Sequence, residues 1–96
     1  MKLQILEPAL AELDEATQYY ERHERDLGES FLTEYGHCLD RISRFPDAWS
    51  FASANCRKCL FKRFPYAVVF SVVDEVILVI AIMHLSREPA YWVERV

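Results

Sequence analysis

Residues 64–83 read FPYAVVFSVVDEVILVIAIM, two apolar runs that are interrupted only by Asp74 and Glu75. Both runs are rich in β-branched residues and have the length of a strand, which is typical of buried β-structure. The two carboxylates predict a tight turn, so this stretch is expected to fold as a β-hairpin. Because neither run alternates polar and apolar residues, we expect both faces of the hairpin to be covered.

The segments before the hairpin predict two amphipathic helices. Pro8 suits the first turn of a helix, and an apolar stripe then continues to about His23. Residues 26–28 predict a turn, and a second stripe begins at Phe31 and is ended by Pro46. Two amphipathic helices joined by a short turn need a surface on which to pack their stripes, and the hairpin supplies it.

Two shorter segments complete the expected sheet. Residues 2–6 alternate well enough for a short strand, and residues 56–63 mix apolar and basic side chains, as strands near a sheet edge do. The order is therefore β-α-α-β-β-β. The sequence predicts an α+β fold with a single domain over residues 1–96, in which a short N-terminal strand and a two-helix hairpin pack on a mostly antiparallel sheet of about four strands.

Composition and charge narrow the class of protein. The chain carries a net charge of −4, but residues 1–40 hold ten acidic and three basic side chains, whereas residues 41–96 hold eight basic and five acidic ones. The overall balance argues against general affinity for nucleic acid, although a basic face is left on the second half. The sequence predicts neither a signal peptide nor a membrane span, so we expect a cytoplasmic protein without a membrane partner.

The three cysteines are expected to be reduced thiols, because their number is odd and no secretory signal is present. Cys56 and Cys59 have the spacing of half a zinc site, but a second pair of ligands is missing. Positions three apart on a strand also point to opposite faces. We therefore expect no metal and no other cofactor.

The residues that follow the hairpin, from His84 to Trp92, form the most polar and aromatic patch of the chain. Together with other segments they resemble the RelE/ParE toxin superfamily of bacterial type II toxin–antitoxin modules, and its plasmid stabilisation branch in particular. The motifs that carry the resemblance cover nearly the whole chain and are, in order, Ala11–Ala16, Tyr19–Glu21, Leu27-Gly28, Phe31-Leu32, Arg57, Phe64–Tyr66, His84, Arg87, Pro89, Tyr91-Trp92 and Arg95.

The resemblance implies a helical hairpin on a twisted sheet and a cognate antitoxin that wraps the toxin in a hetero-oligomer. It also implies one of two targets. ParE-like members inhibit DNA gyrase without being nucleases, whereas RelE-like members are metal-independent endoribonucleases that cut messenger RNA in the ribosome. The acidic balance favours the gyrase inhibitor, because cationic surface aids binding to an RNA-rich ribosome. A non-toxic relic that binds only its antitoxin is a third alternative.

Cleavage of the RelE kind needs an acid or base and cations that stabilise charge on the phosphate. The candidates for catalysis are Arg87, His84, Tyr91 and Arg57, and the candidates for target binding are Lys62, Arg63, Trp92 and Arg95. His84 would transfer a proton and Arg87 would stabilise the transition state. Tyr91 or Trp92 would stack on a base.

Each candidate also has a structural alternative. His84 could instead be a hydrogen-bonded structural histidine at the end of a strand, and Arg87 could instead form an ion pair with Glu88. For Tyr91 and Trp92 we favour a hydrophobic lid that pins the tail to the core.

Three further expectations concern charged segments and the partner. The basic residues of the strand at 56–63 could, instead of binding a target, prevent edge-to-edge pairing of the sheet with another protein. The acidic run from Glu12 to Glu15 is expected to be a solvated helix face. We expect the antitoxin in a groove between the helical hairpin and the basic strand, where it would add a helix or a strand.

Overall fold

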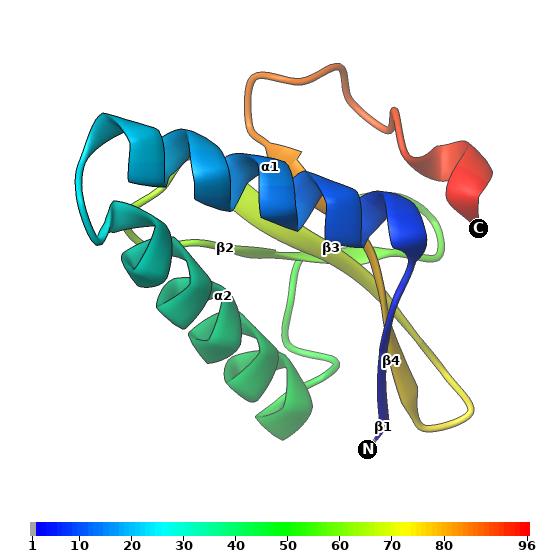
Figure 1. Cartoon of the computed structure of the whole chain (residues 1–96). Helices are drawn as coiled ribbons and strands as arrows, with labels where there is room; N and C mark the ends of the chain where they lie inside the picture. Colours follow the sequence, from blue (N-terminus) through cyan, green and yellow to red (C-terminus); the bar gives the residue numbers. More distant parts are fainter. Residues whose placement is uncertain (1) are drawn as a thin grey trace.

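The structure, a computed structural model, describes residues 2–96 and has an α+β architecture (Figure 1). Two helices, α1 (Glu7–His23) and α2 (Leu27–Arg44), follow the first strand, β1 (Lys2–Ile5). The elements that come next are β2 (Arg57–Leu60), β3 (Tyr66–Val73), β4 (Val76–His84) and a short 3₁₀ helix, η1 (Val93–Arg95). The predicted order β-α-α-β-β-β and the α+β class are confirmed.

The four strands form one sheet in the order β1-β4-β3-β2. β3 and β4 make the predicted antiparallel hairpin. Asp74 and Glu75 form its turn with φ of 51° and 64°, the left-handed backbone that a two-residue hairpin turn needs at both central positions. β2 is an antiparallel edge strand, as predicted, whereas β1 pairs with β4 in parallel. The sheet is therefore mixed but mostly antiparallel.

Both faces of the hairpin are covered, as the missing alternation predicted. The two helices lie over one face (Figure 1), where Phe31 of α2 stacks on Phe61 at 4.9 Å between ring centroids. On the other face, Trp92 from the tail packs with Cys56 and Ile80, and only 1% of its surface is exposed. The tail is thus pinned to the core by a buried aromatic ring.

Glu21, near the end of α1, sets the start of α2. Its carboxylate accepts hydrogen bonds from the backbone N–H groups of Asp26 at 3.1 Å and Gly28 at 3.0 Å, donors that a helix N-terminus leaves free. Gly28 lies inside α2, so the predicted turn at 26–28 was placed too late. The glycine is needed for another reason, since a Cβ atom there would come within 2.8 Å of the carbonyl oxygen of Thr17.

The predicted strand at 56–63 is shorter in the structure and ends at Leu60. Glu34 of α2 accepts the backbone N–H groups of Lys62 and Arg63, and the second of these bonds is 2.7 Å long. These bonds hold the chain in a turn before β3, which the sequence pattern did not reveal. Within residues 2–96, no helix has the length and apolar character needed to cross a membrane.

Candidate functional site

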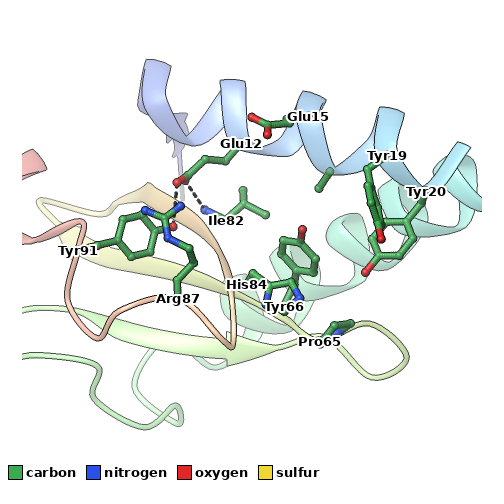
Figure 2. A pocket seen from close by; sticks show the side chains of 11 residues that line it. Glu12, Glu15, Tyr19, Tyr20, Pro65, Tyr66, Ile82, His84, Arg87 and Tyr91 are labelled. Carbon is green, nitrogen blue, oxygen red and sulfur yellow. Dashed lines mark hydrogen bonds between the residues drawn. The ribbon is translucent and has the colours of Figure 1, made fainter. Parts of the chain in front are cut away.

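A cleft of about 500 Å³ lies where α1, the β3–β4 hairpin and the C-terminal tail meet (Figure 2). The lining residues are Glu12, Glu15, Ala16, Tyr19, Tyr20, Pro65, Tyr66, Ile82, His84, Arg87 and Tyr91. The helix contributes carboxylates and tyrosines, and the tail brings Arg87 and Tyr91 to the opposite side. Three residues predicted as catalytic candidates, His84, Arg87 and Tyr91, therefore meet in one cleft.

The Glu12 carboxylate accepts four hydrogen bonds, although the sequence predicted that it would lie on a solvated helix face. Its Oε1 atom accepts from the backbone N–H of Ile82 at 3.1 Å and from Arg95 Nη1 at 2.8 Å. Its Oε2 atom accepts from the Tyr91 hydroxyl at 2.8 Å and from Arg95 Nη2 at 3.0 Å. The prediction for Glu12 is wrong, because α1 turns this residue toward β4 and the tail, where its side chain is 19% exposed.

Tyr91 lies between the Glu12 carboxylate and the guanidinium group of Arg87. The Arg87 guanidinium carbon stands 4.0 Å from the centroid of the Tyr91 ring, and that of Arg95 stands at 5.2 Å. Burial and the hydrogen bond to Glu12 raise the pKa of the Tyr91 phenol above its usual value. The hydroxyl is therefore a fixed hydrogen-bond donor, and Arg87 is stacked on an aromatic face.

His84 ends β4 and is hydrogen-bonded to the turn that follows. Its Nδ1 atom accepts the backbone N–H of Ser86 at 3.0 Å and lies 2.7 Å from the Ser86 hydroxyl. Because an N–H donor points at Nδ1, the neutral ring carries its proton on Nε2. The ring also meets Tyr66 edge to face at 5.0 Å. This is the hydrogen-bonded strand-end histidine that the sequence offered as the structural alternative.

Tyr19, Tyr20 and Tyr66 also line the cleft, with Tyr19 and Tyr20 on the side away from Tyr91 (Figure 2). Tyr20 stacks on Phe31 at 5.3 Å, and Tyr66 meets Phe31 edge to face at 5.0 Å. Burial raises the pKa of both tyrosines, so their hydroxyls stay protonated at neutral pH. Tyr19 is 47% exposed at the rim. Tyr19 and Tyr20 thus pack as predicted for helix residues, with one ring at the surface.

The other cationic candidates lie outside this cleft. Arg57 donates to the carbonyl oxygen of Trp49 at 2.7 Å and places its guanidinium 4.0 Å from the Phe51 ring. Lys62 and Arg63 line a separate cleft of about 290 Å³ against α2. In the part of the chain that the structure describes, the predicted phosphate-binding cations are therefore separated from His84, Arg87 and Tyr91.

Two predicted target-binding residues are used inside the fold. Trp92 is buried on the second face of the sheet, where it pins the tail to the core, as the favoured structural alternative predicted. Arg95 is 21% exposed and pairs with Glu12 while also donating to the carbonyl oxygen of Ile80 at 3.1 Å. Both residues hold the tail in place.

Comparison with known proteins identifies the family. A family model described as the ParE toxin of type II toxin–antitoxin systems, parDE, matches residues 3–89. The chain belongs to the ParE toxin family. A solved structure, the chromosomal ParDE toxin–antitoxin system from P. aeruginosa, shares the fold with a TM-score of 0.64. The identity is 17%, over 90% of this chain and 97% of that one. No curated protein matches the sequence.

This ParE-family chain contains two carboxylates whose contacts within the fold the sequence analysis missed. Glu34 is only 5% exposed and binds the turn at 62–63, and Glu12 binds the tail. A signal for both was present, because each falls on the apolar stripe of its helix. Glu12 lies between Ala9 and Ala16, and Glu34 between Phe31 and Cys38. A charged residue on a buried stripe indicates a specific partner.

A third cleft of the ParE-family chain forms a groove between α2 and β2, where the antitoxin was predicted to bind. A cleft of about 370 Å³ there is lined by Arg41, Ala48, Trp49, Ser50, Lys58, Leu60 and Lys62. It combines three cations with apolar surface, and Leu60 is 51% exposed. Among residues 2–96, no three metal-ligating side chains gather in one place. Cys56 and Cys59 lie on opposite faces of the sheet, as their spacing predicted.

Proposed function

We propose that this chain is a growth-inhibiting toxin that acts in the cytoplasm by binding a protein target, DNA gyrase. A cognate antitoxin would neutralise it. The observation that carries the proposal is the network of Glu12, Tyr91 and Arg95. In this network the Tyr91 hydroxyl already donates a hydrogen bond to Glu12, and the Glu12 carboxylate lies on the wall of the cleft.

The surroundings of the network support a protein target over RNA. Glu15, another carboxylate of the cleft, would repel an RNA phosphate in the position that a nuclease needs. His84 already uses Nδ1 as an acceptor, which leaves an N–H at the other ring nitrogen and no free base in that form. Arg57, Lys62 and Arg63 lie elsewhere, so the cations that would hold the phosphate are not gathered around the proton-transfer groups.

A RelE-like ribonuclease is the second candidate, and one observation favours it. His84, Arg87 and Tyr91 line the same cleft as the partly exposed ring of Tyr66, which offers a base-stacking surface beside a cation. In that mechanism Arg87 would leave the Tyr91 ring and stabilise charge on the phosphate.

One pair of assays distinguishes the candidates. We expect the purified chain to inhibit supercoiling of relaxed plasmid by DNA gyrase, and to leave messenger RNA intact on translating ribosomes. Cleaved transcripts that disappear with Arg87→Ala, with supercoiling unaffected, would establish the ribonuclease instead. Failure in both assays, with a folded protein, would leave the relic that only binds its antitoxin. Circular dichroism of each variant provides the control for folding.

For the antitoxin we propose the groove between α2 and β2. Its cations Arg41, Lys58 and Lys62 suit an acidic segment, and Trp49 and Leu60 suit apolar side chains. The double substitution Lys58→Glu and Lys62→Glu should leave toxicity and abolish rescue by the protein of the adjacent antitoxin reading frame. Lys2→Glu, an exposed charge reversal on the opposite edge strand, serves as the matched control. Undiminished rescue of the double variant would exclude this groove.

A further inference from the structure

Two of the three cysteines meet in the layer between α2 and the sheet. Cys38 of α2 and Cys59 of β2 are both fully enclosed, with no exposed surface. One guanidinium nitrogen of Arg41 lies 3.3 Å from the Cys38 sulfur and 3.8 Å from the Cys59 sulfur. Both sulfurs also contact the carbonyl oxygen of Leu60, at 3.8 and 4.0 Å. Sharing the same donor and the same acceptor places the two thiols side by side.

The surroundings make the two thiols unequal. The neighbouring Cys38 thiol lowers the pKa of Cys59 below its ordinary value, and Arg41 adds to this effect against the opposing effect of burial. The proximity of Cys59 and burial raise the pKa of Cys38 above its ordinary value. Cys59 is therefore the thiol of the pair that ionises more readily, and the thiolate is the reactive form.

We propose that Cys38 and Cys59 are a modification site, at which a peroxide oxidises them to an intramolecular disulfide that ties α2 to β2. The proposal rests on the placement of the two sulfurs under Arg41 and does not depend on which target the toxin binds. Cys56 takes no part, because it is buried on the other face of the sheet with Trp92 and Ile80.

The chemistry balances with hydrogen peroxide as the oxidant. The Cys59 thiolate attacks one peroxide oxygen, the O–O bond breaks, and the hydroxide that leaves takes up a proton to become water. The Cys38 sulfur then attacks the sulfenic sulfur of Cys59, and the second water leaves with the thiol proton. The two thiols together lose two electrons, and the peroxide gains them. A dithiol reductant reverses the reaction by exchange.

Arg41 controls how an oxidant reaches the two thiols, and it is also the side chain that the disulfide would affect. Its side chain contacts both sulfurs and lines both clefts between α2 and the β2 region, so it separates the thiols from these openings. Movement of this one partly exposed side chain admits a molecule as small as hydrogen peroxide. The bridge would fix α2 against the edge strand and would change the sulfur contacts that position Arg41 in the groove between α2 and β2.

The test uses the full chain, reduced and then treated with hydrogen peroxide under native conditions. We expect titratable thiols to fall from three to one, the mass to decrease by two hydrogens, and the mapped bridge to join the peptides of Cys38 and Cys59. Dithiothreitol should restore all three thiols. The matched control is Cys56→Ser, which should still form the bridge, whereas Cys59→Ser should not.

Peptide mapping of the unmutated chain keeps the test valid if a cysteine variant fails to fold. A bridge through Cys56, disulfide-linked dimers, or three unchanged thiols would each overturn the proposal. Sulfinic acid on Cys59 beside a free Cys38 thiol would overturn it as well, because it would show that the neighbouring thiol does not capture the sulfenic acid.

Discussion

Glu12 on α1 and Glu34 on α2 look alike in the sequence but act differently in the fold. Both lie on apolar helix stripes. The carboxylate of each accepts hydrogen bonds from a backbone N–H group and from an arginine side chain. Glu12 pairs with Arg95, whose side chain is 21% exposed, whereas the Arg63 side chain that meets Glu34 is 69% exposed. Glu12 thus fixes the distant end of the chain through side chains, and Glu34 shapes a turn through the backbone.

The burial of the arginine partner determines how much the ion pair of each carboxylate contributes to the free energy of unfolding. An ion pair shielded from water leaves a costly unpaired charge when one member is removed. An exposed arginine returns to water at little cost, so at Glu34 the backbone N–H groups carry the stabilisation. The following substitutions test this difference, from the largest expected effect to the smallest.

Glu12→Ala should have the largest effect. It leaves Arg95 without its carboxylate and removes the acceptor of the Tyr91 hydroxyl and the Ile82 N–H. We expect the free energy of unfolding to fall by about 3 kcal/mol, as measured by urea denaturation. Asp14→Ala, an exposed acid on the same helix, should change it by less than about 0.5 kcal/mol. Equal losses in the two variants would contradict the role of the network.

Glu34→Ala should follow, with a loss of about 2 kcal/mol, because two backbone N–H groups in the turn at 62–63 lose their acceptor. Hydrogen exchange at the amides of Lys62 and Arg63 should accelerate at the same time. The control is Glu29→Ala, an exposed carboxylate in the first turn of the same helix. Unchanged exchange at both amides would show that Glu34 does not hold the turn.

Tyr91→Phe removes one hydrogen bond to Glu12 and should reduce stability by about 1 kcal/mol at pH 7. Because burial and Glu12 raise the pKa of the folded-state phenol above its ordinary value of 10.0, the contribution is complete below that pH and is lost as the pH rises above it. The difference in unfolding free energy between wild type and variant should therefore shrink at alkaline pH. A constant difference from pH 7 to pH 11 would refute the assignment.

Arg63→Ala should have the smallest effect, below about 0.5 kcal/mol, since its guanidinium is mostly in water and lies 3.4 Å from Glu34. The backbone bonds to Glu34 survive the substitution. A loss above about 1 kcal/mol would mean that the side-chain pair stabilises the turn, and the contrast with Arg95 would disappear.

Local patterns in the sequence were sufficient for the elements and their order. The apolar runs around Asp74 and Glu75 predicted the β3–β4 hairpin, and the stripe positions predicted both helices. The closing motif from His84 to Arg95 indicated the family, which the match to residues 3–89 confirmed. These features are readable because backbone periodicity and turn chemistry act over a few neighbouring residues.

The site was only partly predictable. His84, Arg87 and Tyr91 were found because they are close in sequence, and the structure places them in one cleft. For Trp92 the sequence left both base stacking and a buried lid open, because an aromatic residue in a polar segment gives the same pattern whether its ring faces water or the core. Glu12 was missed because its partners lie 70 to 83 residues away.

By itself the sequence determined the α+β class, the hairpin at its centre and the family. Only the tertiary structure decided which charges are paired, which thiols are neighbours, and that Arg57 stands apart from the cleft. The physical reason is range. Secondary structure follows from contacts within a few residues, whereas the partners of Glu12, Glu34 and Cys38 depend on how helices far away in the chain are oriented on the sheet.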